Sequence, residues 1–504
     1  MRSKQAFTKL EELDRKLNMM SHILSVLGWD FETSMSPRGG AERGRQCAWL
    51  GEQIHNLIAC DSTADLIEQV KQDIQTTPAW YSDRDRALVR ILDKACTKER
   101  CVPSSLVTEM AIATNEASDR WFEARGNCDF ASFSPYLEKV FNLTIQRARC
   151  IRPDSPVYDT LLDEFEPGLT AQRTESLFSD MEKTIRKVME MTSRQDTDDS
   201  FLYLKYPRRT QERLDKSIVL AMGFDTRRGV MGISHHPFTT TVGEDDIRIT
   251  SRFTDPRVAD PLFSYIHEGG HALYEMGASN ALTRGTSLAG GTSMAFHESQ
   301  SRLWENVFGH SRPFWEYWYP RFEKAYPRQL EGIGLDRFVR AINKVQASDI
   351  RVNADEVTYG LHIILRFRLE KALFDGSLAI ADLPGAWDEL SMQLLGRRPE
   401  SIASGVLQDN HWAGGAFGYF PSYALGNLIN SQILYTMKSR LDIDALLREG
   451  RLKTLRTWLD RNIYRYGAIY ESPDLLEKVT GQGLTASFFD RYLTEKYTAL
   501  CQGN

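Results

Sequence analysis

The sequence predicts a mainly α-helical protein with one small β-sheet, and three observations support this fold class. Apolar residues recur every three or four positions through most of the 504 residues, and they alternate in one stretch only. The composition, with 42% hydrophobic and 26% charged residues, is that of a folded globular protein. Because no linker, fixed-period repeat or low-complexity segment interrupts the chain, we expect a single large helical body over residues 1–504.

The helical pattern begins near the amino terminus, where apolar residues between positions 7 and 27 are spaced by three and four. The same spacing predicts further helices, which Pro and Gly separate. Their ranges are about 40–57, 104–125, 132–149, 170–191 and 211–222. From residue 229 to 253 the apolar residues alternate instead, and residues 243–245 have the composition of a turn, so we expect a small antiparallel sheet there.

Charge and cysteine content argue against several classes of protein. A net charge of -6 and a pI near 6.0 argue against a nucleic-acid partner. The first 20 residues have scattered charges and no apolar block, so we expect no signal peptide, and no uncharged apolar run approaches the ~20 residues that span a bilayer. Seven cysteines without a CxxC pair fit free thiols in a reducing compartment. We therefore expect a cytoplasmic protein without nucleic-acid or membrane partners.

Residues 267–271 read His-Glu-Gly-Gly-His, the HExxH pattern of a metal site, in a predicted helix from residue 261 to about 276. On that helix His267 and His271 share a face and together can chelate one Zn²⁺ ion, while Glu268 is placed to take a proton from the metal-bound water. The two glycines between them each cost a helix interior about 1 kcal/mol relative to Ala, which indicates a close approach by a substrate or a strand.

A catalytic zinc needs a third protein ligand and one open position. The chain lacks the HExxHxxGxxH extension, so this ligand must come from another helix. A helical stretch that begins at Phe296 follows, and either His297 or Glu298 in it could complete the site. Spacing favours Glu298, with His297 as a hydrogen-bonded core or supporting histidine.

These residues resemble the carboxypeptidase Taq family of metallocarboxypeptidases. The HEGGH motif and the HESQSRLWEN stretch from His297 occur with four further motifs in family order. These are HPF at 236–238, DxRxT at 246–250, IRxxAD at 350–355 and GxxQDxHW at 405–412. The resemblance runs from about Trp29 to the C-terminal end and is densest between 230 and 430. Ser287 replaces a proline and Ala295-Phe296 replaces Gly-Ile, but neither departure falls on a proposed ligand.

The resemblance implies a mostly helical fold with a deep groove, similar to that of neurolysin and peptidases of the angiotensin-converting-enzyme type. Helices within about residues 1–100 would form a lid, and about residues 230–430 the catalytic core. It also implies a cytoplasmic homodimer that removes single residues from peptide carboxyl termini with broad specificity, using one Zn²⁺ or Co²⁺ ion per chain. By motif position, His267, His271 and Glu298 correspond to the metal ligands and Glu268 to the general base.

The reaction needs further groups. The oxyanion requires donors besides the metal, and His411 and Tyr419 are candidates because they are similar to the histidine and tyrosine of the angiotensin-converting-enzyme type. A guanidinium recognises a free carboxylate bidentately, so we assign Arg351 to the substrate terminus, and Asp246 and Arg248 to the closed end of the groove. Aromatic packing and structural salt bridges are the alternatives for these residues. Further candidate substrate-binding residues are His236, Gln408 and Tyr423.

Two other functions compete with a carboxypeptidase. The first is an endopeptidase or oligopeptidase on the same scaffold, which would still cleave a peptide whose C-terminus is blocked. The second is a catalytically inactive metal- or peptide-binding protein. The intact Glu268 argues against the second, because a binding protein needs no base beside its metal.

Overall fold

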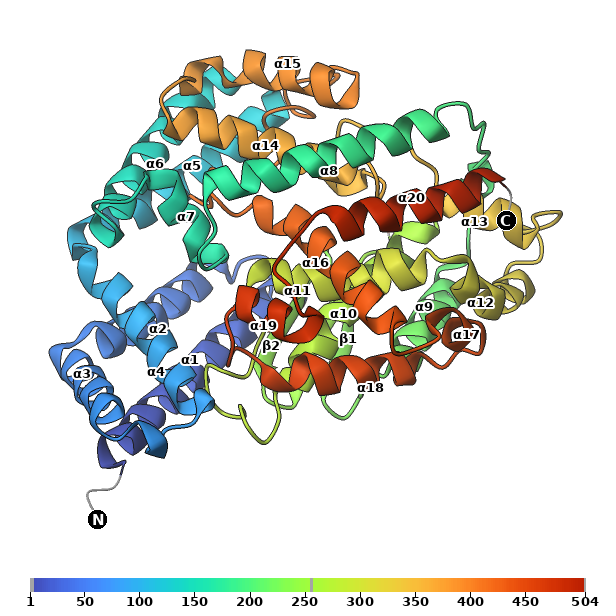
Figure 1. Ribbon diagram of the computed structural model, residues 1–504. Helices are drawn as coiled ribbons and strands as arrows, with labels where there is room; N and C mark the ends of the chain where they lie inside the picture. The colour runs from blue at the N-terminus through green and yellow to red at the C-terminus, as the bar shows by residue number, and fades with distance from the viewer. Residues whose placement is uncertain (1–3, 254–256, 503–504) are drawn as a thin grey trace. The chain divides into compact units, whose positions relative to one another are not determined.

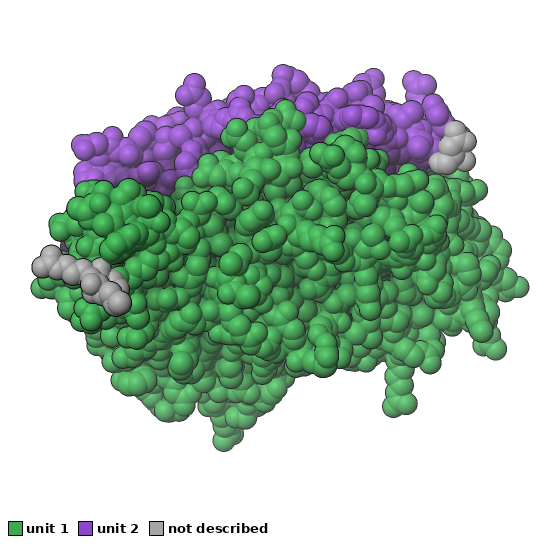
Figure 2. All heavy atoms as spheres, turned by 60° about the horizontal axis from the view of Figure 1, so that its bottom comes forward, with its two compact units in different colours: residues 1–100, 198–342, 433–483 green, residues 101–197, 343–432, 484–504 purple. Residues whose placement is uncertain are grey.

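The structure, a computed structural model, describes residues 4–253 and 257–502. It is mainly helical, which confirms the predicted fold class (Figure 1). The chain forms two compact units (Figure 2). The first comprises residues 1–100, 198–342 and 433–483, and the second comprises residues 101–197, 343–432 and 484–504. Positions 1–3 of the predicted lid lie outside the described residues. Every helix within the described ranges is too short or too polar to span a bilayer.

The helices and strands of the first unit are α1 (Gln5–Thr33), α2 (Gly40–Ala59), α3 (Asp61–Thr76), α4 (Asp83–Cys101), α9 (Arg208–Met222), β1 (Gly229–Ile233), β2 (Thr239–Gly243), β3 (Asp246–Ser251), α10 (Ala259–Ala278), α11 (Met294–Arg302), the π-helix η3 (Leu303–Gly309), α12 (Arg312–Ala325), α13 (Leu335–Ile342), α17 (Ile443–Arg448), α18 (Leu452–Asn462) and α19 (Ser472–Thr480). Its 3₁₀ segments are η1 (Pro78–Trp80), η2 (Ser200–Tyr203) and η6 (Tyr464–Tyr466).

The helices of the second unit are α5 (Ser104–Asn127), α6 (Phe130–Ile151), α7 (Val157–Phe165), α8 (Ala171–Thr192), α14 (Tyr359–Phe374), α15 (Leu383–Leu395) and α20 (Ser487–Gln502), with the 3₁₀ segments η4 (Arg351–Asn353) and η5 (Ile380–Asp382). The last residue of α4 belongs to this unit, and α16 (Pro421–Lys438) divides between the units after residue 432. The predicted helices are confirmed as α1, α2, α5, α6, α8 and α9, and the HExxH helix as α10.

The sheet differs in one respect from the expectation. β2 and β3 pair antiparallel around the predicted turn, but β1 pairs parallel with β3 in the order β1-β3-β2, so the prediction of a wholly antiparallel sheet is wrong. The cause lies in the connection between β1 and β2. The Ser234 hydroxyl and the Phe238 N–H both donate to Oγ1 of Thr250, at 2.6 and 3.0 Å. The connection therefore crosses the end of β3 instead of forming a hairpin, and β1 reaches the other edge of β3.

The amino-terminal helices are tied to the rest of the first unit. Residues of α1 to α4 share one apolar core with Leu288, far along the chain. The buried carboxylate of Asp14 accepts the N–H of Ser287 at 3.0 Å. Near the end of α1, Trp29 packs on Phe238, with ring centroids 5.4 Å apart. The predicted lid region is thus attached to the 287–288 loop and to the segment that leads into β2.

The glycines of the HExxH motif are required by neighbouring helices. A Cβ on Gly270 would lie 2.7 Å from Cα of Ser301 in α11. A Cβ on Gly269 would lie 3.2 Å from side-chain atoms of Val219 and Met222 in α9. The close approach is real, but helices make it, so the expectation of a substrate or a strand at this place is wrong.

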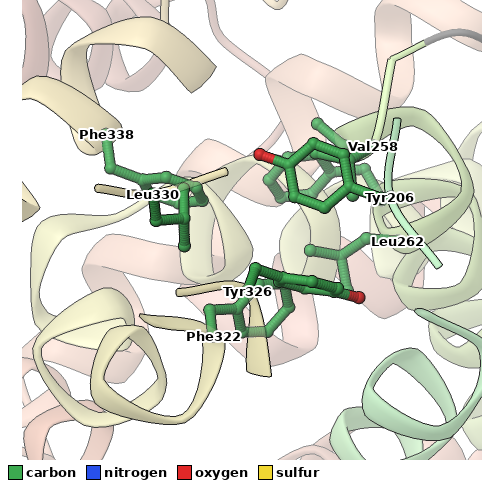
Figure 3. A pocket seen from close by; sticks show the side chains of 9 residues that line it. Tyr206, Val258, Leu262, Phe322, Tyr326, Leu330 and Phe338 are labelled. Carbon is green, nitrogen blue, oxygen red and sulfur yellow. The ribbon is translucent and has the colours of Figure 1, made fainter. Parts of the chain in front are cut away.

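A cavity beside the first turns of α10 is lined by residues of which none is charged (Figure 3). The lining residues are Tyr206, Val258, Ala259, Leu262, Phe263, Phe322, Tyr326, Leu330 and Phe338. The rings of Tyr206 and Tyr326 meet edge to face there, with centroids 4.8 Å apart. Such a lining offers neither a strong metal ligand nor a general base for neutral pH, so this cavity is not the candidate active site.

Replacing Gly270 with Ala is expected to destabilise the fold by about 1–3 kcal/mol, because the added methyl group meets helix backbone that cannot rotate away. Gly51→Ala in α2 is the matched control, since no atom beyond its chain neighbours and the backbone of its own helix lies within 4 Å of the added Cβ. This control should stabilise by about 0.5–1 kcal/mol. Urea unfolding with a chelator present, which removes any contribution of bound metal, measures both changes. Equal stability of the two variants would contradict the expectation.

Candidate active site

The two histidines of the HExxH motif lie one turn apart on α10, with ring centroids at 4.8 Å. The helix forms because its other face is apolar and buried, with Ile266 and Leu273 on either side of the motif. Burial lowers the pKa of His271 to about 3, so this imidazole is neutral, as a metal ligand must be.

Glu298 on α11 faces both histidines. Its Oε2 lies 3.7 Å from Nε2 of His267 and 3.6 Å from Nε2 of His271. Ligand atoms of the three residues lie within 4.8 Å of one another, the arrangement expected for a single metal ion. Burial opposes ionisation of Glu298, but His267 and Arg302 hold its pKa well below the ordinary value. Two imidazoles and one carboxylate suit a divalent cation, so the residues present fit the expected metal.

An acidic residue and an arginine support this set from one side. Nδ1 of His267 lies 2.8 Å from Oε2 of Glu305, which the π-helix η3 carries. Arg302 donates to Oε1 of Glu298 at 2.8 Å and to Oε2 of Glu305 at 3.3 Å. Carboxylates commonly hold metal-bound histidines in this way, and π-helical turns occur frequently at functional sites. Sequence reasoning missed Glu305, although Glu298, Arg302 and Glu305 follow the i, i+4, i+7 spacing of one helix face.

A longer chain of contacts supports the second histidine. Nδ1 of His271 lies 2.5 Å from Nδ1 of His297, and Nε2 of His297 lies 2.8 Å from Oε1 of Glu275. The Thr241 hydroxyl donates to Oε2 of Glu275 at 2.8 Å. When Nε2 of His271 binds a metal, its Nδ1 carries the proton, so His297 must accept on Nδ1 and donate from Nε2. His297 is therefore placed as a supporting residue, the role that sequence spacing favoured for it.

The candidate base is held by the sheet. The Thr239 hydroxyl of β2 donates to Oε2 of Glu268 at 2.5 Å and approaches its backbone oxygen at 3.1 Å. Burial raises the pKa of Glu268 above its ordinary value. A carboxylate that takes up a proton more readily is better matched to general-base catalysis near neutral pH. No sequence pattern indicated the partner hydroxyl, because it lies on another element.

The DxRxT and HPF residues lie in the same unit. Arg248 donates twice to Asp246, from Nε at 2.9 Å and from Nη2 at 2.6 Å. The guanidinium also lies 5.4 Å from the ring centroid of Trp29. His236 is exposed and contacts His235, with ring centroids 4.8 Å apart. Asp246 and Arg248 thus form an ion pair against the end of α1, and their role toward a substrate stays a prediction.

Other predicted residues lie in the second unit. Arg351 donates to Oδ1 of Asp409 from Nε at 3.2 Å and from Nη2 at 2.8 Å, and its Nη1 donates to the Tyr359 hydroxyl at 3.2 Å. Gln408 accepts the N–H of Arg351 at 2.8 Å and donates to the backbone oxygens of Asp349 and Ser404. Gln408 thus fixes local backbone, and its role as a substrate contact stays a prediction.

The candidate oxyanion donors lie close together in this unit. The rings of His411 and Tyr419 stack with centroids 5.6 Å apart, and the Tyr423 hydroxyl lies 3.5 Å from Nε2 of His411. Burial lowers the pKa of His411 to about 4, so its imidazole is neutral at pH 7. A neutral imidazole and a phenol can each donate one hydrogen bond to a developing oxyanion.

The whole chain is similar to known metallopeptidases. Residues 9–497 match the family described as carboxypeptidase Taq (M32) metallopeptidase. The chain belongs to this family. Carboxypeptidase 1 of Bacillus subtilis is 34% identical over 492 residues, which are 97% of each protein. Thermostable carboxypeptidase 1 of Thermus thermophilus is 35% identical over 509 residues, covering 98% of this chain and 99% of that protein. Among solved structures, the M32 carboxypeptidase from Deinococcus radiodurans R1 has a TM-score of 0.94 at 33% identity, with 99% of both chains covered.

Membership of the carboxypeptidase Taq family confirms the resemblance seen in the sequence. The protein is a metal-dependent carboxypeptidase and hence a peptide hydrolase. The comparisons give no support to the endopeptidase alternative. The predicted metal ligands are brought together on α10 and α11, with Glu268 beside the first of them.

Glu275→Gln is expected to weaken metal binding by about 10- to 100-fold, the usual effect of removing a residue that orients a metal-bound histidine. The cause is loss of the negative charge that accepts the hydrogen bond from Nε2 of His297, because the amide oxygen of Gln is a weaker acceptor. Competition with a chromophoric chelator for Zn²⁺ measures the affinity without any substrate. Glu331→Gln, at an exposed carboxylate, is the control and should leave the affinity unchanged. Equal affinities for the two variants would show that His297 does not need a carboxylate as its acceptor.

Proposed function

We propose that the enzyme releases single residues from free peptide carboxyl termini with broad specificity, using one Zn²⁺ ion per chain, with Co²⁺ as the alternative. The observation that carries the proposal is the group formed by His267, His271 and Glu298, with Glu268 next to the first ligand. Two imidazole nitrogens and one carboxylate oxygen suit zinc, and three protein ligands leave a position for water or substrate.

We propose Glu268 as the proton carrier of the reaction. When bound, the metal supplies Lewis acidity that makes a water acidic near neutral pH and polarises the scissile carbonyl. Glu268 accepts a proton from this water and then donates it to the amine that leaves. Thr239 occupies Oε2 of Glu268 and leaves Oε1 without a partner among the described residues, so Oε1 is the oxygen that carries the proton.

Arg351 remains the proposed partner of the substrate carboxylate. Three of its five N–H groups donate to Asp409 and Tyr359, and within the described chain the other two have no partner. Two N–H groups are what a carboxylate needs for a pair of hydrogen bonds. We propose that Asp246 and Arg248, supported by Trp29, limit substrate length at the closed end of the groove, and that His236 and Tyr423 contact substrate.

The proposals for cellular location, oligomeric state and a lid rest on the family resemblance and on the cysteines. We propose a cytoplasmic homodimer in which helices of residues 1–100 act as a lid. All seven cysteines are free, which fits a reducing compartment. Light scattering tests the dimer, because one chain has a mass of 57.6 kDa.

The first experiment compares an N-blocked peptide that has a free C-terminus with the same peptide amidated. Only the free acid should release an amino acid, because an amide cannot form the ion pair with Arg351. Chelator should abolish the release, and Glu268→Gln should lower kcat by about 10²–10⁴-fold with bound metal unchanged. Equal cleavage of the amidated peptide would identify an endopeptidase, and metal binding without cleavage would favour a binding protein.

His411→Ala and Tyr419→Phe are each expected to lower kcat by about 10²–10³-fold, with a smaller change in KM, because an oxyanion donor acts mainly in the transition state. Tyr203→Phe, at a half-exposed tyrosine in η2, is the control and should keep full activity. Steady-state kinetics with the free-acid peptide measures all three. If Tyr419→Phe matches the control, Tyr419 belongs to the aromatic core and donates nothing to the oxyanion.

A further inference from the structure

A buried glutamate of α14 accepts three hydrogen bonds inside the second unit. Glu370 is completely buried, and its Oε1 accepts from Nε1 of Trp412 at 2.7 Å. Its Oε2 accepts from the N–H of Gly418 and from the Tyr158 hydroxyl, each at 2.9 Å. Burial raises the pKa of this carboxyl to about 7. A carboxylate in an apolar interior persists only when donors replace its lost hydration, and here three of them do.

Two of these donors flank the candidate oxyanion residues. Trp412 follows His411 directly, and Gly418 directly precedes Tyr419. Between residues 409 and 420 the chain forms turns, so no helix or strand ladder fixes its course. Gly418 has a φ of +85°, and a Cβ there would lie 2.8 Å from the backbone of Leu161. Backbone hydrogen bonds within residues 410–416 hold the turns of the segment, while side-chain contacts and Gly418 tie it to the rest of the unit.

We propose that Glu370 is a positioning residue, whose carboxylate fixes the segment 409–420 at two points and so sets the places of His411 and Tyr419. The proposal rests on the oxyanion role given to these two residues in the proposed function. The rings of His411 and Tyr419 stack, so a shift at either anchor moves both of them. Misplacement of a reacting group by about 1 Å costs up to roughly 10²-fold in rate.

The chemistry of the donors identifies a substitution that tests the anchoring directly. In Glu370→Gln the side chain keeps its size, but one of its two ends becomes an NH₂ group. Either orientation of the amide then sets this NH₂ against an N–H of Trp412 or of Gly418, and neither N–H can turn away. The Tyr158 hydroxyl can rotate, so it suffers no such conflict. Tyr158→Phe is therefore the matched control, because it removes one hydrogen bond to Glu370 but keeps the stacking on Phe374.

Glu370→Gln is expected to lower kcat by about 10- to 100-fold, with KM and metal content close to those of the unaltered enzyme. Hydrogen exchange in peptides covering 409–420 should become faster, while exchange in α14 itself stays slow. Tyr158→Phe should show much smaller effects on both. The double variant Glu370→Gln/Trp412→Phe should recover part of the lost kcat, because the amide NH₂ then faces a ring edge and not an N–H.

The exchange measurement separates this proposal from the proposed function, because it needs no substrate. If the unaltered protein cleaves no peptide, the proposed function fails while the anchoring of 409–420 is still tested. If exchange and kcat of Glu370→Gln equal those of Tyr158→Phe, Glu370 is a core residue that only stabilises the unit, and the proposal is overturned. Should Glu370→Gln not fold, Trp412→Phe takes its place, with faster exchange in 409–420 as the supporting result and unchanged exchange as the overturning one.

Discussion

The candidate metal site depends on one close contact between two helices. His267 and His271 lie on α10 and Glu298 on α11, and the helices approach so closely at Gly270 that a single added Cβ would meet backbone. Ser301, the residue met there, is one turn from Glu298. Any separation of the helices therefore moves the carboxylate away from both imidazoles together. The energetic cost of glycine inside a helix is offset by placing three candidate ligands within reach of one ion.

The small sheet has a specific use beside this pair of helices. Thr239 and Thr241 are two positions apart on β2, so their side chains lie on the same face of the strand. Glu268 and Glu275 are seven positions apart on α10, which is about two helical turns. The two-residue repeat of the strand and the seven-residue spacing on the helix bring Thr239 to Glu268 and Thr241 to Glu275. One strand thus supports the candidate base directly and His271 through His297.

Sequence reasoning predicted the features that depend on patterns of residues close together in the chain. The HExxH spacing predicted α10 and its two histidines, and helical periodicity predicted six other helices, because both depend on neighbours within one or two turns. Spacing alone left the third ligand open between His297 and Glu298, since both follow the same helix start. The parallel pairing of β1, and the partners Thr239 and Glu370, depend on contacts between distant segments, for which one sequence carries no signal.

Some polar atoms of the GxxQDxHW motif already form hydrogen bonds within the described part of the protein, and one buried polar atom does not. Asp409 accepts four hydrogen bonds, two from Arg351 and two from Arg366, so its carboxylate has no capacity left. Gln408 is similarly engaged, and both residues therefore maintain the fold of the segment. His411 is different, because its Nδ1 has no hydrogen-bond partner among the described residues, although buried polar atoms rarely lack one. Because Nδ1 is buried and lies 4.0 Å from Oδ1 of Asp409, Nε2, which is 3.5 Å from the Tyr423 hydroxyl, is the atom through which this imidazole would meet a substrate.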